Sequence, residues 1–401
     1  MKILGNFKIA HILPWSLDAI NVEQKSEKNL SSTHYHNSIK EIYTYQSSQT
    51  DNDILVIQFA DKNTKKIISK HKNNYFHLFF PQKIFKSKFF GWQISLSLIH
   101  YLIKEKPSII HYHGFLGNQI YFLIIALVNK LFIKSKLIGH HRGIQNFPKI
   151  LKILSFIAIN LADFLIVQNY SIFDILRKKY LIPKSKICVV PNGVSKSVLT
   201  PINKIRARRL IGLRKETIIL LWIGRLDKNK NPLKMLKILK ELRNISKDIQ
   251  LIMIGDGILR DEIESYIIQN NLNESVLLKS WQDQKNLSYF YSACDIFLST
   301  SNQEGFSNVI LEAMYHSLPI IAIKNQGNKD LVSEKNGILT ENDQNQILEA
   351  IINLINDKEK RMEMSQNSKN ISRKYDWDEV NNKIIKIYND VTLQDKILKS
   401  G

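Results

Sequence analysis

Two glutamates and a run of small residues between Glu304 and Pro319 carry the most specific chemistry in the sequence. The stretch EGFSNVILEAMYHSLP begins at Glu304 in a loop and continues as a short apolar helix that ends before Pro319. Ser307 or Asn308 can cap this helix, and its free backbone N–H groups and dipole then attract an anion. Glu304 precedes the helix and Glu312 lies in its second turn. The segment therefore predicts an anion site with a carboxylate on either side.

The order of carboxylate, anion and carboxylate has a chemical explanation. Glu304 can face the hydroxyls of a neutral sugar next to the anion, and Glu312 a second polyol on the far side. A nucleoside-diphosphate sugar has this order of parts: ribose, diphosphate and sugar. An amphipathic helix with two surface glutamates explains the local spacing equally well, so other parts of the chain have to decide.

A basic turn follows the first strand expected in the second half of the chain. The sequence WIGRLDKNKNP, residues 222–232, has Gly224 for a tight turn and Pro232 at the first position of a helix. Arg225 and Lys230 project from the strand end and the loop. These two cations suit a diphosphate, because Arg offers forked donors and Lys a point charge. A solvated basic turn is the alternative in so basic a chain.

Two pairs of histidines end strands in the first half. His111 and His113 lie in IIHYHG, where alternate strand residues point the same way, and His140 and His141 lie in GHHRG. One interpretation is polar contact with a sugar or its acceptor, and another is hydrogen bonding to the local backbone. A zinc site is a third, but no Cys or carboxylate lies nearby in the sequence. We therefore expect no metal.

Three further patterns carry less information. IGDG, residues 254–257, allows the backbone to approach a ligand, but a tight turn explains it equally well. Residues 51–53 have the spacing DxD and are interpreted as a turn before a strand. No phosphate-binding P-loop and no G-x-G-x-x-G sequence is present.

Charge is unevenly distributed along the 401 residues. Residues 1–200 contain 27 Lys and Arg against 10 Asp and Glu, a balance of +17, and residues 201–401 contain 30 against 26, a balance of +4. A basic half indicates nucleic acid or an anionic membrane as partner. Biased use of Lys, Ile and Asn along the chain is the alternative. Since no nucleic-acid motif is present, we expect no nucleic acid and a peripheral contact with an anionic membrane.

Other features concern the compartment. Cys188 and Cys294 lie in apolar runs without CxxC spacing and are expected to be buried and reduced. No secretory signal is recognised at the start. The apolar segment Ile120–Ile133 is interrupted and is shorter than the ~20 residues of a spanning helix. We expect a cytoplasmic protein that contacts the inner face of the membrane peripherally, and the sequence does not define its oligomeric state.

The chain alternates short β-branched runs with helical stretches, which is typical of parallel sheets with crossover helices. We predict an α/β protein with two tandem doubly wound, Rossmann-like domains. Residues 1–200 form the first domain, 201–376 form the second, and a helix within 377–401 packs back on the first. Strands are expected at 8–13, 54–59, 108–112, 136–140, 164–168, 186–190, 217–223, 249–254, 275–279, 295–299 and 319–323. Ligands of such sheets bind beyond the carboxyl ends of the strands, so we expect a cleft where two such ends face each other.

In this order, five stretches resemble the retaining glycosyltransferases of family four, the group one class with the GT-B fold. They are KPSIIHYHG, ADFLIVQNYSIFDILRKKY continuing to ICVVPNGV, IGRLDKNKNP, IGDG, and ACDIFLSTSNQEGFSNVILEAMYHSLPIIA. The last contains the E-x7-E motif of that family with its surrounding strand and helix. The resemblance covers roughly residues 106–390 and is strongest in the second domain.

This resemblance implies roles for particular residues. Glu304 would contact hydroxyls of the transferred sugar near the reacting carbon, and Glu312 would hold the nucleotide ribose. Arg225 and Lys230 would neutralise the diphosphate leaving group, and His113 would lie near the donor sugar. Members of the family retain anomeric configuration and need no catalytic metal, and the donor sugar nucleotide is a substrate. The donor site would further include Gly224, Gly305, Phe306, Ser307, Asn308 and Val309.

The loop after the first strand departs from the family. A Gly-Gly-containing loop is usual there, but residues 13–33 contain no glycine, and hydroxyls at Ser31, Ser32 or Thr33 would have to replace it. We expect transfer of a hexose-type sugar to a lipid-linked or polysaccharide acceptor held by the basic first domain. The alternatives are another GT-B enzyme, such as a sugar-nucleotide epimerase or glucan synthase, and a non-catalytic basic binding protein.

Overall fold

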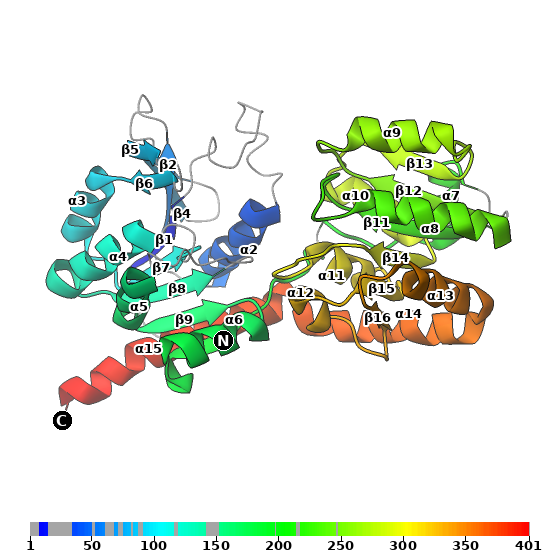
Figure 1. Cartoon of the computed structure of the whole chain (residues 1–401). Coiled ribbons are helices and arrows are strands. Elements are labelled where there is room, and N and C mark those ends of the chain that lie inside the picture. The colour runs from blue at the N-terminus through cyan, green and yellow to red at the C-terminus, as the bar shows by residue number, and fades with distance from the viewer. Residues whose placement is uncertain are drawn as a thin grey trace. The chain divides into compact units, whose positions relative to one another are not determined.

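The computed structural model describes residues 8–14, 34–49, 53–60, 68–70, 75–81, 83–86, 91–115, 119–141, 152–196, 198–213, 217–245 and 248–400. The chain forms two compact units (Figure 1). The first contains residues Met1–Pro191 and Trp377–Gly401, and the second contains Asn192–Asp376. The glycine-free loop at 13–33 and the DxD turn at 51–53 lie largely outside the described residues.

The first unit is built on a sheet with the strand order β10-β9-β8-β7-β1-β2-β4-β3. All its pairings are parallel except that of β3 with β4. Strands β5 and β6, which follow β4 in the sequence, pair with each other as an antiparallel hairpin. The strands are β1 (Lys8–Leu13), β2 (Asp53–Ala60), β3 (Ile68–Lys70), β4 (Tyr75–Pro81), β5 (Lys83–Lys86), β6 (Gly91–Ile94), β7 (Ile109–His113), β8 (Lys136–His141), β9 (Phe164–Val167) and β10 (Ile187–Val189).

Helices cover both faces of this sheet because successive strand residues point to opposite faces. Ala10 and Ile12 pack on one face with α3, α4, α5 and α6, whereas Ile9 packs on the other with α2 and α15. The C-terminal helix therefore returns to the first unit, as predicted. The helices are α2 (His34–Gln49), α3 (Leu96–Glu105), α4 (Gln119–Val128), the π-helix η2 (Asn129–Ile133), α5 (Lys152–Leu161), α6 (Tyr170–Tyr180), the short 3₁₀ helix η4 (Lys184–Lys186) and α15 (Trp377–Ser400).

The second unit contains a fully parallel sheet with the order β13-β12-β11-β14-β15-β16. The order reverses between β11 and β14, which is the switch point of a doubly wound sheet. The strands are Ile- and Leu-rich because both faces are buried. They are β11 (Ile218–Ile223), β12 (Ile249–Ile254), β13 (Val276–Lys279), β14 (Ile296–Ser299), β15 (Ile320–Ile323) and β16 (Gly337–Thr340).

Two helix layers enclose this sheet. Helices α8, α9, α13 and α14 pack on one face, and α10 and α11 pack on the other. Side chains of Asp283, Asp343 and Asp357 cap α10, α13 and α14 by accepting backbone N–H bonds. The helices are α7 (Lys204–Leu210), α8 (Pro232–Ile245), α9 (Arg260–Gln269), α10 (Gln284–Ala293), α11 (Asn308–Tyr315), α12 (Gln326–Lys329), α13 (Gln344–Asn356), α14 (Lys358–Ser372) and the 3₁₀ helix η5 (Arg373–Tyr375).

The division between the units falls nine residues before the boundary placed at 200 and 201. Val194 forms a β-bridge with Asp376, and Leu199 is buried in the core of the second unit. Residues 192–200, which we assigned to the first domain, thus belong to the second unit. In the part of the chain that the structure describes, no helix is long and apolar enough to cross a membrane.

Candidate active site

Two loops meet where the central strands of the second unit end. Because β11 and β14 are parallel neighbours, the residues after them lie at the same edge of the sheet. The backbone N–H of Asn302 donates to the carbonyl of Asn229 at 2.8 Å, and Nδ2 of Asn229 donates to the carbonyl of Gln303 at 3.0 Å. These contacts join the basic turn to the segment that leads to Glu304.

The side chain of Thr300 holds the backbone of the basic turn at residues 222–232. Its Oγ1 accepts a bond from Nε1 of Trp222 at 2.9 Å and donates to the carbonyl of Lys230 at 2.7 Å. Both Trp222 and Thr300 are buried. Sequence reasoning did not identify Thr300 or Asn229, because their partners lie about seventy residues away. The available signal in the sequence was the position of Thr300, a polar residue directly after the buried strand β14.

Lys230 and Glu304, which the sequence assigned to a diphosphate and a sugar, form an ion pair. Both side chains are largely buried, at 17% and 12% exposure. The backbone N–H of Lys230 also donates to Oδ1 of Asp227 at 2.9 Å. Arg225 differs, because its side chain is 75% exposed and pairs with Asp227 at 3.0 Å. The structure thus holds Lys230 firmly and presents Arg225 to solvent.

Two glycines permit close backbone approach at this edge. A Cβ atom on Gly255 would lie 1.8 Å from the carbonyl oxygen of Gly224. The backbone N–H of Gly224 donates to the carbonyl of Ile254 at 3.0 Å. A Cβ on Gly327 would lie 2.8 Å from the carbonyl oxygen of Glu304. The close packing of strand ends accounts for Gly255, and Gly327 positions the Glu304 backbone.

The N-terminus of α11 is formed as expected, with one difference. Ser307 occupies the N-cap position but makes no capping hydrogen bond, and within the described residues its buried Oγ has no hydrogen-bond partner. Asn308 begins the helix and accepts a bond from Nδ2 of Asn192 at 2.8 Å. Phe306 packs against Tyr375. The first N–H groups of α11 are therefore not bonded to the Ser307 side chain.

Glu312 is a buried carboxylate, 4% exposed. Its Oε2 accepts a bond from the hydroxyl of Tyr291 at 2.9 Å, and its Oε1 accepts one from Nε2 of Gln284 at 3.2 Å. Burial, and next the charge of Glu312, raise the pKa of Tyr291 well above its ordinary value. The alternative of two surface glutamates is therefore wrong for Glu312. Gly305 is buried next to Glu304, and Val309 is half-buried in the first turn of α11.

His316 completes this side of α11. Its Nδ1 contacts the carbonyl of Glu312 at 2.8 Å, and its ring stacks on Tyr291 with centroids 5.0 Å apart. Burial lowers the pKa of His316 to about 4, against the smaller opposing effect of the Glu312 carbonyl. The imidazole is thus neutral at pH 7 and supports the helix that carries Glu312.

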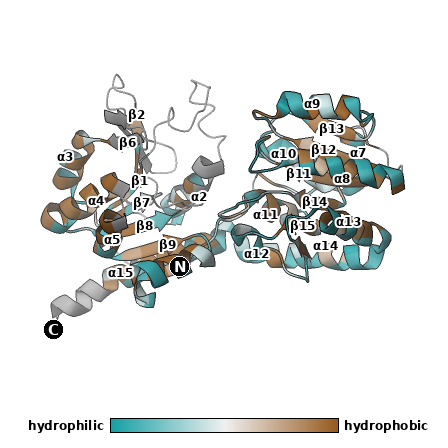
Figure 2. Cartoon of the chain, in the orientation of Figure 1, coloured by the Kyte–Doolittle hydropathy of each residue, from teal (hydrophilic) through white to brown (hydrophobic). Residues whose placement is uncertain are grey.

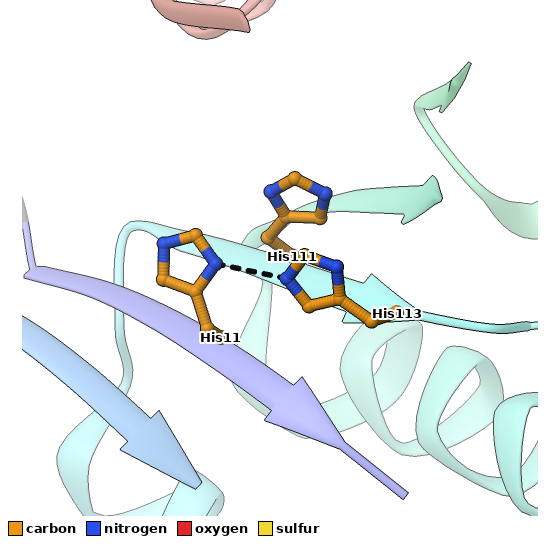
Figure 3. A group of neighbouring side chains, drawn as sticks. All are labelled: His11, His111 and His113. Carbon is orange, nitrogen blue, oxygen red and sulfur yellow. Dashed lines mark hydrogen bonds between the residues drawn. The ribbon is translucent and has the colours of Figure 1, made fainter. Parts of the chain in front are cut away.

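His11, His111 and His113 of the first unit form a buried group of imidazoles (Figure 3). His11 on β1 contacts Nε2 of His113 through its Nδ1 at 3.0 Å. The His111 ring stacks on that of His113 with centroids 4.2 Å apart, and its nitrogens contact the Tyr388 hydroxyl at 2.5 Å and His140 at 3.1 Å. Side chains, and not the local backbone, thus satisfy His111. His11 was missed, although it is in register with His111 on the neighbouring strand.

Three of these imidazoles, those of His11, His111 and His113, offer nitrogen atoms within 4.8 Å of one another. Lone pairs of an imidazole lie in the plane of its ring. The His111 and His113 rings are nearly parallel at 18° and are stacked, so their lone pairs do not converge on one point. A hydrogen-bonded stack fits this geometry better than a metal site. His113 is fully buried, and its contact with a donor sugar stays a prediction.

Family comparisons agree with the two units. Residues 203–371 match the family described as glycosyl transferases group 1, and residues 54–198 match glycosyltransferase family 4. A glycosyltransferase from Rickettsia africae has a similar structure, with a TM-score of 0.75 and 15% identity over 97% of this chain and 99% of that one. Anabaena HepE in complex with UDP has a TM-score of 0.72 and 18% identity, over 96% and 100% of the chains. The two Rossmann-like units define the GT-B fold.

Curated proteins add sequence relatives. One is the UDP-Gal:alpha-D-GlcNAc-diphosphoundecaprenol alpha-1,3-galactosyltransferase of Escherichia coli, 29% identical over 67% of this chain and 75% of that protein. Another is the N-acetylgalactosamine-N,N'-diacetylbacillosaminyl-diphospho-undecaprenol 4-alpha-N-acetylgalactosaminyltransferase of Campylobacter jejuni, 26% identical over 54% and 57%. The protein is a glycosyltransferase, with a family 4 domain followed by a group 1 domain.

Proposed function

We propose that this protein transfers a hexose-type sugar from a nucleoside-diphosphate sugar to a lipid-linked glycan acceptor, with retention of anomeric configuration and without a metal. The names of the E. coli and C. jejuni relatives support the acceptor class, since both act on sugars carried by diphosphoundecaprenol. The E. coli name also contains a nucleotide sugar, UDP-Gal. A polyprenol-diphosphate-linked sugar is thus the first acceptor to test.

One geometric observation supports the proposed donor site. Lys230, Glu304 and the N-terminus of α11 lie together beyond the ends of β11 and β14, where doubly wound sheets bind ligands. A diphosphate at this edge would receive N–H donors of α11 and the charge of Lys230. The exposed guanidinium of Arg225 can reach the same group without first being removed from a buried pair.

The reaction then needs little beyond electrostatics. The acceptor hydroxyl attacks the anomeric carbon, the bond from that carbon to the phosphate oxygen breaks, and the departing diphosphate takes the hydroxyl proton. Negative charge develops on the diphosphate, and fixed cations and helix N–H groups stabilise it. Glu304 would contact hydroxyls of the sugar during this step.

Glu312 suits the ribose and not the reacting carbon. It is held in place by Tyr291 and Gln284, and it lies in the second turn of α11, away from Glu304 at the loop. A covalent route as in glycosidases uses two carboxylates that flank one scissile bond. With Glu312 assigned to the ribose, Glu304 lacks such a partner, which favours same-face attack.

The proposal is tested in two assays. Nucleoside diphosphates and their sugars should raise the melting temperature of the protein, and radiolabelled sugar should pass from the best donor to a polyprenol-diphosphate-linked acceptor. Glu304→Gln should keep donor binding and lose most transfer. If no nucleotide stabilised the protein, the donor site would be contradicted. If the product formed in the presence of EDTA had inverted configuration, the retaining mechanism would be contradicted.

A further inference from the structure

The first unit carries an exposed apolar surface that its core does not need. Among the residues that the structure describes, most of its large exposed apolar side chains lie on α4, η2 and α5, and α4 packs against both η2 and α5. We call it the α4–α5 surface, and Figure 2 colours these helices largely as hydrophobic. Leu131 and Ile153 are 65% and 75% exposed. Its members are Leu127, Leu131, Phe132, Ile153, Leu154, Phe156 and Ile157.

Helix α5 carries apolar side chains on two faces. It buries Ser155, Ala158 and Ile159, whereas Ile153, Phe156 and Ile157 face outward. These three are spaced as i, i+3 and i+4 and therefore share one face. Surface helices of globular proteins ordinarily direct such a face to the core. A continuous outward apolar face of this kind marks an interaction site.

The charge of the segment that contains these helices favours one kind of partner. Residues 62–162 contain sixteen Lys and Arg and a single acidic residue, Glu105. Among them Lys104, Lys106, Lys130 and Lys134 are exposed at the ends of α3 and η2, and α3 and η2 are in contact. Apolar side chains with exposed lysines beside them fit the boundary between headgroups and acyl chains of an anionic bilayer. An apolar protein partner does not require this excess of positive charge.

We propose that the α4–α5 surface docks on an anionic lipid bilayer, with the outward side chains of α5 and η2 inserted and the neighbouring lysines on the headgroups. This goes beyond the donor site and depends on a different part of the chain. The docking would bring the first unit to the surface in which a lipid-linked acceptor lies. Attraction between the lysines and the anionic headgroups adds to the binding, and salt weakens it.

Vesicle flotation of the full chain tests the proposal. Wild-type protein should float with vesicles containing phosphatidylglycerol at low salt, less at high salt, and weakly with phosphatidylcholine alone. Ile153→Ser/Ile157→Ser should bind about tenfold more weakly, since two inserted side chains are lost. Lys130→Glu/Lys134→Glu should lose most of the salt-dependent binding. Ile245→Ser/Ile258→Ser is the control, because Ile245 and Ile258 are also exposed, at 62% and 85%, but lie in the second unit.

Two results would overturn the proposal. One is flotation of Ile153→Ser/Ile157→Ser and of Lys130→Glu/Lys134→Glu that equals flotation of the wild type. The other is a concentration-dependent dimer in light scattering that Ile153→Ser/Ile157→Ser dissociates, which would assign the surface to a second copy of the chain. Nucleotide-induced thermal shifts, measured in parallel, should be unchanged in every variant. They separate failure of docking from failure of the donor site and show that each variant is folded.

Discussion

The ammonium group of Lys230 is paired with the carboxylate of Glu304, although 74 residues separate them in the sequence. The two residues lie on loops that follow β11 and β14, and Thr300 and Asn229 bond these loops to each other. The pair is largely shielded from solvent. A diphosphate that approaches α11 would share Lys230 with Glu304, so the same contact can orient the lysine before the donor binds.

Lys230→Ala should lower kcat/KM for sugar transfer by about a hundredfold to a thousandfold, because one fixed charge that stabilises the leaving group is removed. Steady-state transfer assays with the donor found by thermal shift measure it. Lys324→Ala is the matched control, since Lys324 pairs with Glu341 on the surface of the same unit, and it should stay within about twofold of wild type. Equal activity of both variants would exclude Lys230 from the site.

Glu312→Gln should raise the KM for the donor by about tenfold with a smaller effect on kcat, because a contact with the ribose is made equally in the ground and transition states. Tyr291→Phe should keep the carboxylate but lower the free energy of unfolding by about 1.5–3 kcal/mol, since a buried charged acceptor loses its donor. Tyr289→Phe, on the same helix, is the control. A donor KM unchanged in Glu312→Gln would leave Glu312 with a structural role alone.

Stability of the second unit should fall as the pH drops from about 6.5 towards 4. His316 has its pKa lowered to about 4 in the folded protein, against about 6.5 when unfolded. Between these values the unfolded chain binds a proton that the folded chain does not, so acid favours unfolding, by on the order of 3 kcal/mol at most. Urea denaturation at several pH values measures the slope. His316→Gln should reduce it, and a slope identical to wild type would contradict this assignment.

Zinc should leave the melting temperature unchanged to within about 1 °C, because a metal that binds only the folded state would otherwise raise it. We expect no zinc binding because the rings of His111 and His113 are stacked and because His111 is bonded to Tyr388 and His140. Differential scanning fluorimetry with Zn²⁺ and with EDTA provides the measurement. A rise that disappears in His11→Ala would show instead that the three imidazoles rearrange to hold the ion.

Much of the fold follows from local patterns in the sequence. Strands β1 and β12 have the bounds that were predicted, 8–13 and 249–254, because buried parallel strands are runs of β-branched and aliphatic residues. Strand β4 was missed, since its YFHLFFP is aromatic and not β-branched. Strand β16 was missed because GILT is short and has a glycine, which approaches the backbone of Ile320 closely.

The sequence by itself determined the two α/β sheets, the return of the last helix, and the short helix between Glu304 and Pro319. Periodicity, capping residues and charge types are local properties, and they can be identified in the sequence alone. Only the tertiary structure decided the pairing of Lys230 with Glu304, the burial of Glu312 under Tyr291, and the stacking of His11 on the histidines of β7. It also decided that α5 buries Ile159 but exposes Ile153 and Ile157. These relationships depend on which strands become neighbours, and no local pattern contains that information.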